Sequence, residues 1–409
     1  MTTLMIVEPE ATGHRMVLYV RLIVAEALAR GLEVILLTST DAMHHDACKA
    51  LLAEFGDRLK VATMPESSHD GKSRFGLFRS QYRRLRAFQA GYRAVSRQQR
   101  VDFIYIPYFN YIDKIIGWYG APFDGVPFGG MIVAAKFHHA RYGIAGARGK
   151  QDAINELFFR VALRVRNLAL LTSIDEPLIE FVNRSMMRHV GKVRYVPDVS
   201  TIRRPAERSS ARLAYGLSPT DFVVLLYGSI SPRKGLEKVL RLFSAGDLPS
   251  HVRLLLIGSQ EEAAKEMIET FLAQHPERRI QVRIVDRFVT DIEEGQAFAC
   301  ADVVWLCYEN FSGMSGVLIQ SAQAGVPVVT SGYGLIERYR EKYKLGMRWG
   351  DFVNIDGDDK KIDWGHLVES SKAIFGAPQL SSFAGRHTPQ AFGRNIVDAI
   401  LASTNGRRP

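Results

Sequence analysis

The amino-acid sequence predicts an α/β protein built from two doubly wound domains that face each other across a cleft. Three observations lead to this fold class. The chain has 409 residues, which is too long for one ordinary core and fits two domains of roughly 150–200 residues each. Short apolar runs rich in Val, Ile and Leu alternate with helical patterns, as expected for parallel sheets covered on both faces. The same alternation starts again after a polar segment in the middle of the chain.

The first half begins with an apolar run and a polar turn, Thr12-Gly13-His14. A helical pattern covers about 16–29, and Gly31 stands where helices commonly end. Near-continuous apolar runs of this length are typical of buried parallel strands. We expect strands at Leu4–Glu8, Glu33–Thr38, Leu59–Met64, Val101–Tyr108, Gly130–Ala135 and Leu168–Ser173.

The second half repeats the pattern. Strands are expected at Phe222–Tyr227, Val252–Ile257, Val282–Val285, Asp302–Cys307 and Pro327–Thr330. Helices are expected at Gly235–Phe243, Glu261–Gln274, Asp291–Ala301 and Ser315–Ala324. The polar stretch from Pro197 to Pro219 holds three prolines and separates the halves. We predict two Rossmann-like domains, 1–197 and 198–385, with the last helix, about 386–404, as a candidate to pack back on the first.

Composition places the chain among globular proteins, with 47% hydrophobic and 23% charged residues. The chain contains no run of about 18 apolar residues, so no membrane-spanning helix is predicted. Its start has no basic region of the signal-peptide type. Cys48, Cys300 and Cys307 form neither a disulfide framework nor a metal-ligand spacing. Cys300 and Cys307 lie in apolar runs and are expected to be buried thiols. A cytoplasmic protein is the expectation.

Positive charge is concentrated in the first half. The net charge is +10, and residues 71–100 hold nine Lys or Arg without any Asp or Glu. Residues 136–166 add seven basic residues against two acidic ones. Such a field attracts phosphates, nucleic acid or an anionic bilayer.

The loop from Gly228 to Gly235 is the strongest candidate site. It joins a strand to a helix and carries the basic pair Arg233 and Lys234. Gly228 permits a sharp turn, Gly235 permits close approach at the helix start, and the free N–H groups of a helix N-terminus favour an anion. A diphosphate would gain charge-assisted hydrogen bonds here. An ordinary exposed loop with a solvated basic pair explains the same residues, and no Walker motif is present.

Five blocks in the second half resemble the second domain of retaining GT-B glycosyltransferases of the GT4 type. They span about 110 residues, and Val193–Asp198 resembles the interdomain linker of that family. The blocks are the loop Gly228–Gly235, Arg253–Gly258, Val282–Phe288, Ala301–Trp305 and Ala322–Thr330. The resemblance implies an acceptor-side domain over 1–197 and a nucleotide-sugar-binding domain over 198–385. It also implies transfer of a sugar, with retained anomeric configuration, to a saccharide or lipid-linked saccharide in glycan or polysaccharide biosynthesis.

The resemblance also implies roles for single residues. Lys234 and Arg233 would stabilise the charge that develops on the departing diphosphate. His138, after an expected strand of the first domain, would contact the donor sugar, although an exposed or merely packed histidine explains it equally well. The donor-binding residues implied are Gly13, His14, Gly228, Ser229, Arg287, Phe288, Ser312, Gly313, Met314, Ser315, Gly316 and Gln320.

The chain departs from the family at three of these positions. Ser312 and Gln320 stand where the family usually carries glutamates, and Ser229 stands where it carries an arginine. The glycine-rich stretch 313–316 still offers backbone N–H groups to an anion. Two interpretations remain open: an active transferase, or a non-catalytic, membrane-associated partner in a glycan assembly complex. A GT-B epimerase or phosphorylase is less favoured, because no epimerase carboxylate pair and no clear pyridoxal-phosphate lysine are found. No metal motif is found either, and we expect no metal or other cofactor.

Residues 72–100 predict a helix with an aromatic stripe and a basic flank. The stripe is Phe75, Phe78, Tyr82, Leu85, Phe88, Tyr92 and Val95, and the flank is Arg79, Arg83, Arg84, Arg86, Arg93 and Arg97. A core stripe with solvated arginines is the simpler interpretation. The positive run still suggests peripheral attachment to the inner face of a membrane. No nucleic-acid-binding motif is found, so nucleic acid is not expected as a partner.

Overall fold

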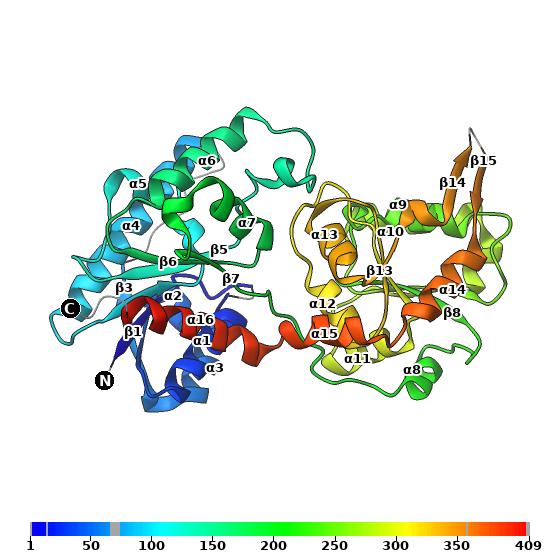
Figure 1. Cartoon of the computed structure of the whole chain (residues 1–409). Coiled ribbons are helices and arrows are strands. Elements are labelled where there is room, and N and C mark those ends of the chain that lie inside the picture. The colour runs from blue at the N-terminus through cyan, green and yellow to red at the C-terminus, as the bar shows by residue number, and fades with distance from the viewer. Residues whose placement is uncertain (1, 14, 66–73, 357–358, 406–409) are drawn as a thin grey trace. The chain divides into compact units, whose positions relative to one another are not determined.

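The computed structural model describes residues 2–13, 15–65, 74–356 and 359–405. The chain divides into two compact units, each with its own parallel sheet (Figure 1). The first unit contains Met1–Asp198 and Pro389–Pro409, and the second contains Val199–Thr388. The chain thus leaves the first unit after Asp198 and returns to it at Pro389.

The first unit is built on a seven-stranded parallel sheet in the order β3-β2-β1-β4-β5-β6-β7. Its strands are β1 (Thr3–Val7), β2 (Glu33–Ser39), β3 (Leu59–Met64), β4 (Phe103–Ile106), β5 (Phe128–Ile132), β6 (Leu168–Ser173) and β7 (Val193–Tyr195). Its helical segments are η1 (Arg15–Val20), α1 (Arg21–Ala29), α2 (Thr40–His44), α3 (Asp46–Phe55), η2 (Gly56–Arg58), α4 (Arg74–Ser96), η3 (Phe109–Tyr111), α5 (Ile116–Tyr119), η4 (His139–Tyr142), α6 (Lys150–Ala162), α7 (Glu176–Ser185), η5 (Met187–His189) and α16 (Pro389–Asn405). All residues of β1 and β4 are buried, which explains their continuous apolar sequence.

The fifth strand lies earlier than the sequence indicates. The expected strand at 130–135 is wrong, because β5 spans Phe128–Ile132. Its two glycines belong inside the strand: a Cβ on Gly129 would overlap the Leu170 carbonyl oxygen, and one on Gly130 would lie 2.5 Å from the Ile106 carbonyl oxygen. Here glycine marks close packing between neighbouring strands rather than a strand end.

The C-terminal helix α16 packs against α1, so the red and blue ends of the chain lie together in the first unit (Figure 1). The rings of Tyr19 and Phe392 stack with their centroids 5.1 Å apart. Gly393 faces the Leu22 backbone so closely that a Cβ would lie 2.7 Å from its carbonyl oxygen. The chain end therefore completes the core of the domain where the chain began.

Helix α4 is partly buried, and the expected solvated basic flank is wrong at one position. Arg84 is buried, and its guanidinium pairs with Glu10 and lies 4.4 Å from the centre of the Tyr111 ring. The aromatic stripe is also divided: Phe88 is fully buried, whereas Tyr82 is 40% exposed. The N-terminal part of the described helix thus presents aromatic side chains to solvent.

The second unit is built on a six-stranded parallel sheet in the order β10-β9-β8-β11-β12-β13. Its strands are β8 (Phe222–Tyr227), β9 (Val252–Ile257), β10 (Val282–Val285), β11 (Val303–Leu306), β12 (Val328–Thr330) and β13 (Gly346–Arg348), and a separate antiparallel hairpin pairs β14 (Val353–Asp356) with β15 (Asp359–Ile362). Its helical segments are α8 (Arg208–Ala214), η6 (Pro232–Lys234), α9 (Leu236–Phe243), α10 (Glu262–Gln274), η7 (Pro276–Ile280), α11 (Asp291–Cys300), α12 (Gly316–Gln323), α13 (Gly334–Tyr343), η8 (Trp349–Asp351), α14 (Trp364–Ile374) and α15 (Pro378–Arg386). The apolar runs predicted three of these strands, β8, β9 and β10, with the observed bounds, but β13 and the hairpin were not predicted.

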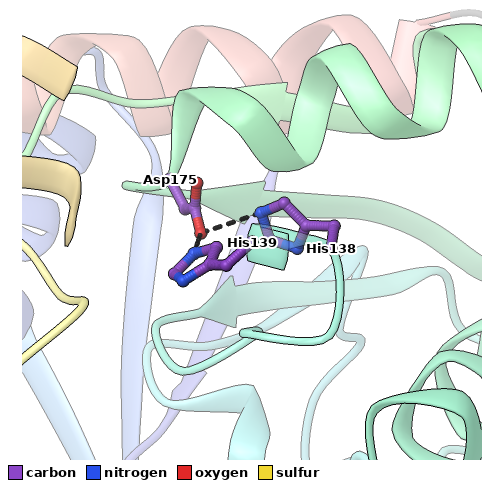
Figure 2. Close-up of side chains that lie close together, drawn as sticks. All are labelled: His138, His139 and Asp175. Carbon is purple, nitrogen blue, oxygen red and sulfur yellow. Dashed lines mark hydrogen bonds and ion pairs between the residues drawn. The ribbon is translucent and has the colours of Figure 1, made fainter. Parts of the chain in front are cut away.

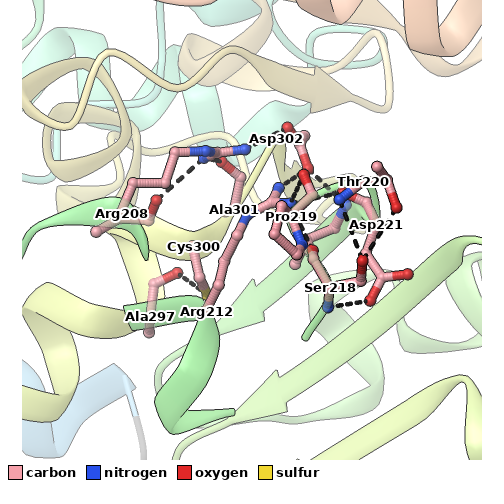
Figure 3. Close-up of polar contacts among 12 residues, drawn as sticks. Arg208, Arg212, Ser218, Pro219, Thr220, Asp221, Ala297, Cys300, Ala301 and Asp302 are labelled. Carbon is pink, nitrogen blue, oxygen red and sulfur yellow. Dashed lines mark hydrogen bonds and ion pairs between the residues drawn. The ribbon is translucent and has the colours of Figure 1, made fainter. Parts of the chain in front are cut away.

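Asp302 ties the start of this unit to its sheet (Figure 3). Its carboxylate accepts the Val223 N–H at 2.7 Å, the Arg212 guanidinium at 2.7 Å and the Arg208 guanidinium at 2.5 Å. Arg212 is buried and also donates to three carbonyl groups, those of Ser218, Pro219 and Asp221. Because removing one partner would leave a buried charge unpaired, we assign this network to fold stability.

Burial of the cysteines agrees with the sequence. Cys300 and Cys307 are buried free thiols, as expected, and so is Cys48. Among the described residues no helix combines the length and apolar character needed to cross a bilayer.

Candidate functional site

The loop between β8 and α9 is fixed by a glycine at each end. Gly228 has φ of 93° and Gly235 has φ of 76°, a backbone region that strains other residues. A Cβ on Gly235 would overlap the Cys307 carbonyl oxygen just beyond β11. Trp305 of β11 donates its indole N–H to the Gly235 carbonyl oxygen at 3.1 Å. The start of α9 is therefore held against the neighbouring strand.

Lys234 places a buried amine inside this loop. The side chain is only 6% exposed, and its ammonium donates a hydrogen bond to the Tyr227 carbonyl oxygen. Burial, with a smaller effect from the neighbouring Arg233, lowers the pKa of Lys234 to about 8. A Cβ on Gly228 would lie 2.8 Å from the amine nitrogen, so the glycine also leaves room for it.

Arg233 adds a second cation at the surface of the same loop. Its guanidinium lies 4.8 Å from the centre of the Phe311 ring and 5.8 Å from that of Tyr308. Its carbonyl oxygen accepts the Glu309 N–H at 2.7 Å, which links the loop to the segment after β11. Among the described residues, neither Arg233 nor Lys234 has a carboxylate within ion-pair distance, so no acidic side chain neutralises either charge.

The segment after β11 carries Phe311, which lies against the Arg233 guanidinium, and then leads into the N-terminus of α12. Helix α12 begins at Gly316, and the side chain of its N-cap residue, Ser315, makes no capping hydrogen bond. Ser312 and Ser315 are both buried, and the Ser312 carbonyl oxygen accepts the Leu335 N–H at 3.2 Å. The other predicted donor-binding residues are Ser229, which lies in the loop between β8 and α9, and Gly313 and Met314, which lie between β11 and α12. Uncapped N–H groups at a helix start favour a bound anion.

Gln320 is engaged by a carboxylate that the sequence did not single out. Its side-chain amide donates to Glu294 at 2.9 Å, and the Tyr227 hydroxyl donates to the same carboxylate oxygen at 2.7 Å. Glu294 lies on α11, one residue after the capping-box glutamate of the Thr290–Glu293 helix start. The position expected to carry a glutamate thus holds an amide, and an acidic side chain reaches it from a neighbouring helix.

Arg287 and Phe288 follow β10 and differ in their surroundings. Arg287 forms an ion pair with Glu293. This pair, together with a hydrogen bond from the Thr290 N–H, lowers the pKa of the Glu293 carboxyl to about 2. Phe288 is 91% exposed. An aromatic ring exposed to this extent offers a stacking surface to a planar group.

In the first unit, an acidic and aromatic cluster follows β1. Glu8 is fully buried and accepts a hydrogen bond from the Tyr111 hydroxyl at 2.5 Å. Burial raises the pKa of Glu8 to about 7, although the Tyr111 hydrogen bond opposes the shift. Glu10 pairs with Arg15 and Arg84, and Arg15 donates to the Tyr111 hydroxyl at 2.7 Å. The sequence indicated none of these contacts, because Glu8 ends an apolar run and Arg84 belongs to a helix that is distant in the chain.

Two predicted residues follow the same strand. Gly13 has φ of 68°, and a Cβ added to it would meet no described atom within 4 Å. Glycine is therefore favoured at this position by the backbone conformation and not by lack of space. His14 lies outside the described residues.

His138 is buried, and its neighbours are another histidine and an aspartate (Figure 2). His139 Nε2 lies 2.7 Å from Asp175 Oδ2, and His138 Nε2 lies 3.1 Å from the same oxygen. The His138 ring packs against Phe137 and Phe181, with ring centres 5.4 and 6.0 Å away. Burial lowers the pKa of His138. Burial opposes ionisation of Asp175, but the two histidines outweigh it and hold the pKa of that carboxyl below its usual range.

Solved structures that resemble the chain extend over both units. Sucrose-phosphate synthase from Thermosynechococcus elongatus covers 99% of the chain with a TM-score of 0.59 and 16% identity, and 97% of that protein is matched. The Anabaena protein HepE, solved in complex with UDP-glucose, covers 98% with a TM-score of 0.61 and 13% identity, and 100% of that protein is matched. The chain has the GT-B glycosyltransferase fold.

Curated relatives support the same relationship in sequence. The D-inositol 3-phosphate glycosyltransferase of Mycobacterium sp. (strain KMS) is 27% identical over 230 residues, which are 55% of this chain and 47% of that protein. Its counterpart from Mycobacterium tuberculosis (strain F11) is 27% identical over 207 residues, which are 49% and 40% of the two chains. This GT-B chain therefore spans about half the length of the curated relatives that it matches. No protein-family model matches it.

The predicted residues of the GT-B second unit fall into two groups. Strand-end loops bring Gly228, Lys234 and Gly235 together as local sequence indicates, because a strand, a loop and a helix are consecutive in the chain. The contacts of Lys234 with Tyr227 and of Gln320 with Glu294 depend on tertiary packing. The expected donor contacts of all these residues, and of Gly13, His14 and His138, stay predictions.

Proposed function

We propose that the protein is a retaining glycosyltransferase that moves a sugar from a nucleotide-sugar donor to a saccharide or lipid-linked saccharide acceptor in glycan biosynthesis. The support is its GT-B fold, its glycosyltransferase relatives and, above all, the buried amine of Lys234. HepE, which shares the fold, was solved with UDP-glucose. A nucleoside diphosphate sugar is accordingly the proposed donor class.

Lys234 carries the proposal because its charge is fixed before any ligand binds. A leaving diphosphate accumulates negative charge as the bond to the sugar breaks. A cation held in a low-dielectric position stabilises that charge more strongly in the transition state than in the ground state. Arg233 and the uncapped start of α12 would add donors to the same anion. The proposed reaction needs no metal for this step.

Substitution of Lys234 tests the proposal. We expect Lys234→Met to retain the fold and to lower kcat roughly 10²–10³-fold, the usual cost of removing one transition-state donor. Turnover would be measured with a screen of uridine, guanosine and adenosine diphosphate sugars, after a thermal-shift screen for the nucleotide that stabilises the wild type.

Lys238→Ala is the matched control, since Lys238 lies one turn along on α9 and pairs with Glu309 at 2.9 Å. Loss of a half-exposed ion pair changes stability by less than about 1 kcal/mol. Wild-type turnover by the Lys234→Met variant, with the donor bound, would refute the proposed role.

A second candidate function is a non-catalytic partner in a glycan assembly complex. Ser312 and the amide of Gln320 favour it, because Gln320 already donates to Glu294 and neither position offers a negative charge. Donor hydrolysis separates the two functions. A binding-only protein would be stabilised by a nucleotide sugar yet hydrolyse none of those tested.

Attachment to an anionic membrane surface at the inner face is part of the proposal. The exposed aromatics of α4 and α5 lie together: the Tyr82 and Tyr119 rings are 4.9 Å apart, and Trp118 is 65% exposed. Aromatic rings beside a basic helix suit the interface of an anionic bilayer.

Liposome flotation tests this attachment. We expect the wild type to float with vesicles containing anionic lipid and to stay behind with neutral vesicles, and a Trp118→Ala/Tyr119→Ala variant to lose most of the binding. Leu213→Ala removes an 80% exposed apolar side chain from the second unit and is the control. Equal flotation of all three proteins would exclude this surface.

A further inference from the structure

His138, His139 and Asp175 are brought together by two neighbouring strands. The histidines follow β5 and the aspartate follows β6, and these strands pair in parallel with Ile132 opposite Ser173. The Ser173 hydroxyl donates to the Ile132 carbonyl oxygen at 2.9 Å and accepts the Asp175 N–H at 3.2 Å. The carboxyl ends of both strands are thereby fixed side by side. One nitrogen from each histidine and one Asp175 oxygen all lie within 4.8 Å of one another.

Hydrogen bonding inside the cluster leaves several of its atoms unsatisfied. All three side chains are buried, and one Asp175 oxygen faces both imidazoles (Figure 2). The Nδ1 of His138, the Nδ1 of His139 and the Oδ1 of Asp175 have no hydrogen-bond partner among the described residues, and His138 Nε2 faces Asp175 Oδ2 at 3.1 Å without meeting hydrogen-bond geometry. Buried polar atoms in native proteins are nearly always paired, so three unpaired atoms on three adjacent side chains require an explanation.

The surroundings of the cluster supply no balancing cation. Among the described residues, only the two histidines lie within ion-pair distance of Asp175. The nearby Arg141 guanidinium lies over the Phe181 ring at 5.1 Å and is paired with Glu156 at 3.0 Å. A buried carboxylate whose side-chain neighbours are two imidazoles is a favourable partner for a positive ion.

We propose that His138, His139 and Asp175 form a binding site for a divalent transition-metal cation, with Zn²⁺ as the best match. Two imidazole nitrogens and one carboxylate oxygen are ligands that Zn²⁺ accepts, whereas Ca²⁺ and Mg²⁺ prefer oxygen alone. Three protein ligands leave a fourth tetrahedral position for water or a ligand oxygen. The bound ion would satisfy the facing His138 nitrogen and neutralise the aspartate. Assigning His138 to the ion replaces the donor-sugar contact that the family resemblance implies for this residue.

Metal titration of the whole chain tests the site without an activity assay. After chelator treatment and removal of the chelator, isothermal titration with Zn²⁺ should show one tight site per chain, and Zn²⁺ should raise Tm. Co²⁺ in the same site should give the visible absorption of a tetrahedral complex. Absence of stoichiometric binding by the wild type would overturn the proposal and leave a hydrogen-bonded triad.

Substitutions locate the ion. His139→Gln and Asp175→Asn should each weaken Zn²⁺ binding at least tenfold and abolish the Tm increase, with far-ultraviolet circular dichroism to confirm folding. The control is His44→Gln/His45→Gln, which removes an exposed histidine pair beside Asp46 that could bind metal adventitiously. The control should bind Zn²⁺ like the wild type. Binding that is lost in the control and kept in both cluster variants would show an adventitious surface site and overturn the proposal.

Discussion

At the scale of single residues, Lys234 shows how burial converts a common side chain into a tuned charge. Its amine has a carbonyl group rather than a carboxylate as hydrogen-bond partner, so desolvation is not offset. The pKa falls from 10.5 to about 8. In the unliganded protein the buried charge therefore lowers stability below about pH 8, and stability should rise between about pH 8 and 10.5 as the unfolded chain binds more protons.

This shift predicts the pH dependence of anion binding. Affinity for a nucleoside diphosphate sugar should fall above about pH 8, where Lys234 loses its proton. Well above the pKa, the Kd should rise about tenfold per pH unit, as for any single ionisation. Titration calorimetry from pH 6.5 to 10 measures this Kd. Lys234→Met should bind weakly with little pH dependence, and an unchanged wild-type Kd up to pH 9.5 would show that the amine does not contact the anion.

At the scale of elements, the loop from β8 to α9 depends on close backbone packing. Gly228 and Gly235 share a positive φ but differ in what surrounds them. The Gly235 Cα faces the Cys307 backbone, whereas the Gly228 Cα faces only the tip of the Lys234 side chain. Backbone atoms of a sheet cannot move aside, but a flexible amine can.

The two glycines should therefore respond differently to alanine. Gly235→Ala adds a backbone overlap to the strained φ and should cost about 3 kcal/mol or more. Gly228→Ala should cost only about 1–2 kcal/mol from its φ, yet should weaken anion binding by displacing the amine. Urea unfolding measures both effects. Gly246→Ala, which meets no atom within 4 Å, is the control, and equal stability losses for Gly228 and Gly235 would contradict this account.

At the scale of the whole molecule, the first unit is completed by the far end of the chain. Helix α16 buries Phe392, Ile396, Val397 and Ile400 in the unit that begins with β1, and its Asp398 pairs with Arg30 at 3.1 Å on the surface. The first unit is consequently complete only with residues that follow the entire second unit in the chain, since α16 lies after Thr388.

Two substitutions in α16 separate its core from its surface. Phe392→Ala removes a buried ring stacked on Tyr19 and should destabilise the first unit by roughly 3–5 kcal/mol. Asp398→Ala breaks an exposed ion pair and should cost less than about 1 kcal/mol. Calorimetric unfolding with limited proteolysis would identify the unit affected. A loss confined to the second unit would contradict the observed packing of α16.

The sequence by itself determined the fold class and the position of the basic loop. Alternating apolar runs and helical patterns are local, and a strand followed by Gly228, Lys234 and Gly235 needs no knowledge of distant residues. Strand ends were less well determined. The glycines of β5 looked like a strand boundary because their reason, the neighbouring carbonyl groups of Ile106 and Leu170, lies elsewhere in the chain.

Only the tertiary structure decided which charges are buried and what they contact. Arg84 appeared to be one of several solvated arginines, yet it lies against Glu10, 74 residues away. Gln320 appeared to have lost a charge, yet Glu294 of another helix reaches it. His138 and His139 matched no metal motif because Asp175 follows a different strand. Tertiary packing, including the pairing of parallel strands, brings such residues together and buries them. Their pKa values depend on this burial, and no local pattern of residues encodes it.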